Sequence, residues 1–230
     1  MIRQFPLDLR WPPHQRLDAF WPGANVPALQ GVAGVASGGM GWLYLHGASG
    51  TGKSHLLIGA CRAAIETNRA ARYVSLAQLP VPRVDAIAVI DAEGLLAIDD
   101  VQAIAGERED ERALFDLYNR AKAAGARMVF AANAAPSEID IKLPDLVSRL
   151  AMCTQYALRP LDDAGRRAML RVLAGRLGLR LDDEVLDWWF ARQPRDPASL
   201  VALLQRVDRA SLAAQRRITI PFLRELLGQQ

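Results

Sequence analysis

The sequence predicts an α/β fold in which helices flank a parallel five-stranded sheet, followed by a small all-α domain. Three observations support this fold class. Up to about residue 158, short apolar segments alternate with longer helical patterns, as in sheets whose parallel strands are joined by helices. A glycine-rich stretch follows the first apolar segment, at the strand end where such folds bind ligands. From residue 159 onwards, the pattern is helical throughout.

The length of 230 residues suits one large domain and one small one. We expect a tail over residues 1–22, an α/β domain over 23–158 and a small helical domain over 159–230. The only cysteines, Cys61 and Cys153, both lie in apolar segments, which argues against a disulfide framework or a cysteine metal cluster and predicts a cytoplasmic protein. Neither a secretion signal nor a membrane span is expected.

Positive charge is concentrated in the C-terminal part of the chain. Residues 159–230 contain thirteen arginines and nine carboxylates, whereas residues 1–158 are close to neutral. This excess is weak for a DNA-binding domain, and most such arginines lie on solvated faces or in intramolecular ion pairs. Direct contact with DNA is therefore left open.

Prolines at three positions exclude a regular helix near the N-terminus, namely Pro6, Pro12 and Pro13. An extended segment places Leu7 and Leu9 on one side, where they either fill a partner's groove or belong to a frayed terminus. Two aromatic residues, Phe20 and Trp21, then precede a turn ahead of the first strand. They either wall a base pocket or fasten the edge of the domain.

The most specific motif is GASGTGKS over residues 47–54, which fits the phosphate-loop pattern G-x-x-x-x-G-K-S/T without substitution. A strand is predicted before it over residues 42–45, and a helix after it over residues 55–65. In such a loop, backbone N–H groups and the positive helix end bind phosphates, while Lys53 reaches the β- and γ-phosphates and Ser54 ligates Mg²⁺. The residues predicted to bind the nucleotide are Gly47, Ser49, Gly50, Thr51, Gly52, Lys53, Ser54 and His55.

Two carboxylates complete the predicted nucleotide site. After a strand over residues 71–76, the apolar segment 94–100 predicts a further strand that ends in Asp99 and Asp100. If this strand lies beside the phosphate-loop strand, Asp99 holds Mg²⁺ through water and Asp100 polarises the attacking water.

The remaining elements of the α/β part follow in the same alternation. The charged residues 107–112 predict the first turns of a helix that ends near Gly125. A fourth strand over residues 127–133 ends in Asn133 at the same sheet edge. A short helix over residues 143–150 carries Arg149, and a fifth strand follows near residues 153–158.

Four helices are predicted in the C-terminal part. Asp162 or Asp163 caps the first, which extends to Leu177, and Asp182 caps the second. The fourth begins near Pro221. The third has an apolar stripe that comprises Leu200, Leu203, Leu204, Val207, Ser211 and Ala214.

Several of these stretches together carry a family resemblance. Residues 47–57 (GASGTGKSHLL), 98–102 (IDDVQ) and 143–150 (LPDLVSRL) resemble AAA+ proteins of the DnaA initiator branch. Residues 115–120 and 208–222 resemble the DnaA-homologous regulators that inactivate DnaA, and the match covers nearly the whole chain. Since no helix-turn-helix segment follows the helical part, we expect a regulator rather than an initiator.

The resemblance implies roles for particular residues. In this family an N-terminal peptide docks on the DNA polymerase III sliding clamp, and the similar segment here contains Gln4, Phe5, Leu7 and Leu9, with Phe5 replacing the usual leucine. Arg149 occupies the position of the family's arginine finger, which acts in trans. Asn133 occupies the position called sensor I. Ala198 stands where an arginine of the family's helical lid domain, sensor II, normally meets the nucleotide, so contact of the lid with the γ-phosphate is left open.

The implied function is regulation of replication initiation. The clamp-bound protein presses Arg149 against the nucleotide of ATP-loaded DnaA and stimulates its hydrolysis, while its own site holds ADP or ATP with Mg²⁺. Its partners are then DnaA, the clamp β subunit and, through the clamp, DNA; the working nucleotide, any ATPase activity of its own and a homodimer are left open. The alternatives are an autonomous DNA-stimulated AAA+ ATPase or helicase loader, and a clamp-binding adaptor with a structural nucleotide.

Overall fold

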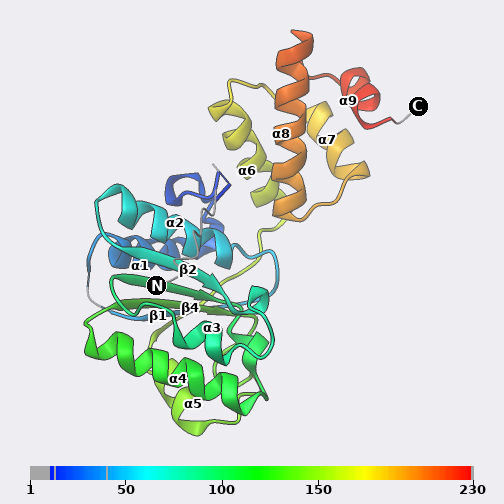
Figure 1. Cartoon of the computed structure of the whole chain (residues 1–230). Helices are drawn as coiled ribbons and strands as arrows, with labels where there is room; N and C mark the ends of the chain where they lie inside the picture. Colours follow the sequence, from blue (N-terminus) through cyan, green and yellow to red (C-terminus); the bar gives the residue numbers. More distant parts are fainter. Residues whose placement is uncertain (1–10, 13, 40, 229–230) are drawn as a thin grey trace. The chain divides into compact units, whose positions relative to one another are not determined.

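The computed structural model describes residues 11–228 apart from residues 13 and 40, and Figure 1 shows the whole chain. The chain divides into two compact units, residues 1–159 and residues 160–230, which are described separately. The predicted clamp-binding residues 4–9 lie outside the described residues. In the described part of the chain, no helix combines the length and the apolar character needed to cross a membrane.

A five-stranded parallel sheet forms the centre of the first unit, as predicted. Its strands lie in the order β2-β3-β4-β1-β5. Their bounds are β1 Leu43–His46, β2 Ala71–Ser75, β3 Leu95–Asp99, β4 Arg127–Ala132 and β5 Thr154–Ala157.

The strand order corrects one expectation. We considered β3 as the neighbour of the phosphate-loop strand, but β4 lies between β1 and β3. Asp99 nevertheless faces the helix that follows the phosphate loop, because side chains alternate along a strand and Leu95 and Ala97 pack on that helix's side. The helix itself packs across β3, so adjacency of the two strands is not required.

Helices cover both faces of the sheet (Figure 1). One face packs against α1, Val26–Ala36, and α2, Lys53–Glu66, through alternate strand residues such as Leu45 and Val129. The other face packs against α3, Val84–Ala88, α4, Arg108–Ala123, and α5, Pro144–Ala151, through residues such as Tyr44 and Phe130. With both faces covered, the inner strands β1, β3 and β4 are mainly apolar and buried, which explains the continuous apolar runs in the sequence.

Two helices of this unit were not expected from the sequence. The α1 segment VPALQGVAGVA lacks charged residues and contains two glycines and a proline, so no polar face marks its helical period. The α3 segment is only five residues long, too short to show a period.

The second unit is a bundle of four helices, as predicted. These are α6 Asp163–Arg176, α7 Asp183–Arg192, α8 Pro197–Ala214 and α9 Ile220–Leu227. Asp162 is the side chain that caps α6, since its carboxylate accepts from Gly165 N at 2.7 Å. Asp182 occupies the N-cap position of α7, but its side chain makes no capping hydrogen bond.

The predicted inner stripe of α8 is correct only for its first half. Leu200, Leu203, Leu204 and Val207 are buried, whereas Ser211 is half-buried and Ala214 is exposed. The physical reason is length: α8 has 18 residues and the other helices of the bundle have 8 to 14, so its last turns extend past them. The periodicity continues although the packing partners end.

Candidate nucleotide site

The phosphate loop connects β1 to α2, and its glycines adopt conformations that other residues rarely reach. Gly47, Gly50 and Gly52 have φ angles of 148°, 78° and 94°. A Cβ at Gly47 would lie 2.5 Å from the carbonyl oxygen of Leu158, and one at Gly52 would lie 2.5 Å from the ring of Phe20. Thr51 is buried and its hydroxyl donates to Ala48 O at 2.9 Å, while Ser49 and Gly50 are exposed.

Lys53, the first residue of α2, lies folded over the loop. Its Nζ donates to the carbonyl oxygens of Gly47 at 2.6 Å and Ala48 at 2.9 Å. Burial lowers its pKa, and the attraction of Asp99 and Asp100 opposes this shift. The ammonium group therefore lies inside the loop and close to both carboxylates, where it can exchange carbonyl partners for phosphate oxygens.

Asp99 is a buried carboxylate, 1% exposed, with three hydrogen-bond donors. Tyr73 Oη donates to it at 2.9 Å, the backbone N–H of Asp100 donates at 2.9 Å, and the Ser54 hydroxyl forms a further hydrogen bond. Burial raises the pKa of Asp99, and these hydrogen bonds oppose the rise.

The residues present fit a magnesium ion. A hydroxyl and a carboxylate, Ser54 and Asp99, lie within hydrogen-bond distance of each other at the loop. In proteins Mg²⁺ usually binds only one or two side-chain oxygens and keeps several of its waters. One hydroxyl and one carboxylate that acts through water are therefore enough protein ligands for the ion. Among the described residues, no group of three or more His, Cys, Asp or Glu side chains is arranged to hold a metal ion.

Asp100 and Asn133 are linked through Gln102. The Asp100 carboxylate accepts from Ser75 Oγ at 2.7 Å and from Gln102 Nε2 at 3.3 Å. The side-chain oxygen of Gln102 in turn accepts from the backbone N–H of Asn133 at 3.2 Å. One amide thus connects the C-terminal ends of β3 and β4 beside the loop.

His55 is turned away from the loop. Its Nε2 donates to the carbonyl oxygen of Arg16 at 2.9 Å, and its ring meets Phe20 edge-on with centroids 5.4 Å apart. Burial is the main cause that lowers the pKa of His55. Phe20 therefore lies between the N-terminal segment and the phosphate loop, a position that suits either of its two predicted roles.

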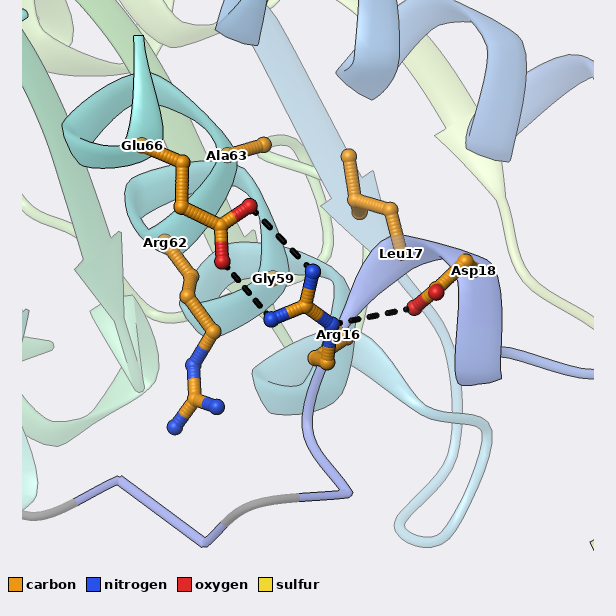
Figure 2. A pocket seen from close by; sticks show the side chains of 7 residues that line it. All are labelled: Arg16, Leu17, Asp18, Gly59, Arg62, Ala63 and Glu66. Carbon is orange, nitrogen blue, oxygen red and sulfur yellow. Dashed lines mark hydrogen bonds and ion pairs between the residues drawn. The ribbon is translucent and has the colours of Figure 1, made fainter. Parts of the chain in front are cut away.

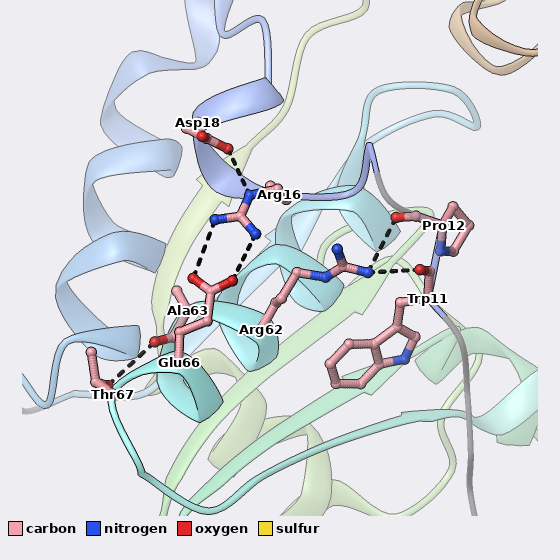
Figure 3. A network of polar contacts seen from close by, with 8 residues as sticks. All are labelled: Trp11, Pro12, Arg16, Asp18, Arg62, Ala63, Glu66 and Thr67. Atoms are coloured by element: carbon pink, nitrogen blue, oxygen red, sulfur yellow. Dashed lines mark hydrogen bonds and ion pairs between the residues drawn. The ribbon is translucent and has the colours of Figure 1, made fainter. Parts of the chain in front are cut away.

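The N-terminal segment runs along α2, and we call residues 14–20 the N-terminal strap. Arg16 pairs with Glu66 through two hydrogen bonds of 2.7 and 3.3 Å, and a shallow cavity of about 220 Å³ lies beside this pair (Figure 2). Arg62 Nη2 donates to the carbonyl oxygen of Trp11 at 2.6 Å (Figure 3). A Cβ at Gly59 would lie 2.9 Å from Leu17, so the strap lies directly on α2.

Arg149 lies near the N-terminal end of β1, whereas the phosphate loop follows its C-terminal end. Its guanidinium is 5.9 Å from the centroid of the Tyr118 ring, and Tyr118 packs edge-on against Trp42 with centroids 4.3 Å apart. Trp42 immediately precedes β1, whereas the phosphate loop follows its far end, about 13 Å away at roughly 3.3 Å per residue. Among the residues described, no ion pair joins Arg149 to Asp145, the acidic residue four positions earlier on the same helix.

Sequence reasoning missed Tyr73, Ser75, Gln102 and Tyr118, which contact the predicted site residues. Tyr73 and Ser75 had a usable signal in the sequence. They are two residues apart on a predicted strand, so both side chains lie on the same face of the sheet. Gln102 lies two residues after Asp100 and had none beyond its polarity. Tyr118 falls within the helix predicted to end near Gly125, and this position gives no indication of a contact with Arg149.

Two family models match most of the chain. A model described as the bacterial DnaA ATPase domain matches residues 17–156, and a model described as the Hda lid domain matches residues 163–227.

Three solved structures illustrate the similarity of fold. Domain III of the Thermotoga maritima replication initiation protein DnaA has a TM-score of 0.71 at 22% identity, with 94% of this chain and 97% of that chain covered. Replication initiator DnaA bound to AMPPCP and single-stranded DNA gives 0.70 at 21% identity, with 89% and 69% covered. A RuvB variant from Thermotoga maritima gives 0.64 at 15% identity, with 93% and 71% covered.

Proposed function

Because the chain belongs to the bacterial DnaA ATPase-domain family and carries an Hda-type lid, and is thus an Hda-like AAA+ protein, we propose that it inactivates ATP-loaded DnaA. It attaches through Gln4, Phe5, Leu7 and Leu9 to the β subunit of the sliding clamp on DNA. From there it stimulates hydrolysis of the ATP bound to DnaA. The product is ADP-bound DnaA, which does not initiate again.

The position of Arg149 carries this proposal. Its guanidinium lies on Tyr118 at the sheet edge opposite the phosphate loop, so it is available to a nucleotide held by another molecule rather than by this chain. A guanidinium supplied in trans neutralises charge that develops on the γ-phosphate during phosphoryl transfer. Its planar pair of donors suits two phosphate oxygens at once.

The chain's own loop binds ADP or ATP in this proposal. Gly47 to Ser54 surround the phosphates, Lys53 contacts them, and Ser54 with Asp99 holds Mg²⁺, which neutralises phosphate charge. Asp100 orients water and Asn133 contacts the γ-phosphate. The similarity of fold to a DnaA bound to AMPPCP supports nucleotide binding.

The decisive experiment measures hydrolysis of DnaA-bound ATP in the presence of DNA-loaded clamp. Arg149→Ala should reduce the stimulated rate on the order of 10³-fold, because a finger in trans contributes about that much. Nucleotide and clamp affinities should stay at the wild-type level. A matched control is Arg192→Ala, since Arg192 also lies on an aromatic ring, 5.2 Å from the centroid of Trp188, but in the lid unit.

Stimulation by the Arg149→Ala variant at the wild-type rate would refute the proposal. Steady-state ATP turnover by the isolated protein, increased by single-stranded DNA, would instead favour an autonomous ATPase or helicase loader. Clamp binding without any effect on DnaA would favour an adaptor.

A further inference from the structure

Glu111 is a fully buried carboxylate that no role proposed above uses. It lies in the first turn of α4 with 0% of its surface exposed. Its two oxygens accept from the backbone N–H groups of Gly106 at 2.8 Å, Lys142 at 2.9 and 3.0 Å, and Leu143 at 2.8 Å. Two of these donors immediately precede α5, the helix that carries Arg149.

The start of α5 has no cap of its own. Its N-cap residue is Leu143, which has no side-chain acceptor, and Pro144 follows at the first helical position. Glu111 accepts from the backbone N–H of this N-cap residue, as a Glu at the third helical position does in a capping box, but it comes from another helix. A negative charge at this end also interacts favourably with the helix dipole.

The other end of α5 is held by the same helix. Tyr118 follows Glu111 by seven residues, about 10 Å along α4 at roughly 1.5 Å per residue, and therefore lies on nearly the same helix face. Arg149 follows Leu143 by six residues, about 9 Å along α5. The spacings match because the two helices pack side by side (Figure 1), so α4 contacts α5 at both ends.

We propose that Glu111 is a positioning residue for Arg149. Its carboxylate fixes the start of α5, Tyr118 supports the guanidinium at the end, and the two together present Arg149 to the partner's nucleotide in one orientation. The inference rests on the proposed function for its effect on rate, but the fixing of α5 can be tested without it.

Glu111→Gln is a sharp test because it keeps the shape and changes the hydrogen bonding. A carboxylate offers acceptors on both oxygens, whereas an amide offers one oxygen and directs its NH₂ group at a backbone donor. One side of the site is then left with donors facing each other, whichever way the amide is turned. Burying such unmatched groups weakens the contact that holds α5.

Amide hydrogen exchange measures directly how firmly α5 is held. In Glu111→Gln, the amides of residues 142–150 should exchange at least about tenfold faster, because local opening becomes easier, while those of α2 should not change. The matched control is Asp110→Asn: Asp110 is also buried on α4, 2% exposed, but it accepts from Arg83 N at 2.8 Å and Arg83 Nη1 at 3.2 Å. It should alter exchange near α3 only.

The rate of clamp-dependent hydrolysis of DnaA-bound ATP measures how the loss of the Glu111 carboxylate affects the action of Arg149. Glu111→Gln should lower the maximal rate about tenfold or more and leave the half-saturating protein concentration near wild type, since alignment rather than docking is disturbed. In an Arg149→Ala background, Glu111→Gln should cause no further loss. Equal fold-losses in both backgrounds would show that Glu111 does not act through Arg149 and would overturn the proposal.

Two outcomes separate this inference from the proposed function. Unchanged exchange in residues 142–150 overturns the inference even where Arg149→Ala abolishes stimulation. Faster exchange in Glu111→Gln supports the fixing of α5 whatever the role of Arg149. If Arg149→Ala at the same time stimulates hydrolysis at the wild-type rate, the proposed function is refuted. If Glu111→Gln does not fold, Tyr118→Leu tests the other contact, with the same non-additivity expected against Arg149→Ala.

Discussion

The hydroxyl of Tyr73 donates a 2.9 Å hydrogen bond to Oδ2 of Asp99 and thereby joins β2 to β3 at the candidate nucleotide site. Burial is the largest cause that raises the pKa of Asp99, and the Tyr73 hydrogen bond is one of those that oppose it. The ionised state of this carboxylate therefore depends on its donors, and one of them comes from a residue with no part in the phosphate-loop motif.

Tyr73→Phe should lower the free energy of unfolding by about 1–3 kcal/mol at pH 7, because a buried carboxylate loses a donor. The substitution raises the folded-state pKa of Asp99 further. A raised carboxyl pKa destabilises the fold only while the group is ionised, so the difference between variant and wild type should shrink as the pH falls towards about 3.9, the unfolded value.

Chemical denaturation at pH 7 and at pH 4.5 measures this difference. Tyr156→Phe is the control, since the Tyr156 hydroxyl lies against Gly31 on α1 rather than at Asp99. A difference of the same size at both pH values would mean that the loss does not arise from the ionised Asp99.

Lys53→Ala should reduce ADP affinity by about tenfold to a hundredfold, the effect of losing a charged hydrogen-bond donor to phosphate. The fold should persist, because the bonds lost within the protein are two contacts to loop carbonyls. Isothermal titration calorimetry gives the affinity, and Lys122→Ala, an exposed lysine on α4, serves as control. Unaltered ADP affinity would refute the placement of the nucleotide at this loop.

Gly59→Ala should release the N-terminal strap. The added Cβ would lie 2.9 Å from the Leu17 side chain and 3.0 Å from its backbone nitrogen, so the strap must shift. Trypsin should then cut faster after Arg16. In contrast, Gly175→Ala on α6 meets nothing within 4 Å and should raise stability by about 0.5–1 kcal/mol, as expected for glycine replaced in a helix.

The strap test is a comparison of the two glycines. Equal trypsin sensitivity at Arg16 in wild type and Gly59→Ala would show that the strap tolerates a side chain at this position. Loss of stability in Gly175→Ala would show that this variant is not a valid control for the effect of a Cβ added at Gly59.

Changing Gln4, Leu7 and Leu9 together to alanine should abolish binding to the sliding clamp, because an extended peptide presents these side chains to a groove. Nucleotide affinity should not change. Surface plasmon resonance with immobilised clamp measures the interaction, and Asp8→Ala is the matched control, since the family resemblance assigns clamp contact to Gln4, Phe5, Leu7 and Leu9 but not to Asp8. Clamp affinity that survives removal of residues 1–10 would return this segment to a simple chain terminus.

The sequence by itself determined the local elements of this protein. The phosphate loop, the five strands, Asp99 and Asp100 at a strand end, and the four C-terminal helices all follow from spacings within short windows of sequence. Side-chain alternation and helical periodicity fix which residues of a segment are buried, and they need no knowledge of the neighbouring segment. Even α1 was missed for a local reason, because a uniformly apolar helix has no polar face.

Only the tertiary structure decided which elements meet. It placed β4 between β1 and β3, turned His55 to Arg16, and set Glu111 and Tyr118 against the two ends of α5. Asn25 and Arg159, 134 residues apart, exchange two hydrogen bonds of 2.8 Å. Such contacts depend on how whole helices and strands pack, since a backbone donor far along the chain is available to a carboxylate or amide only after the intervening elements have folded between them.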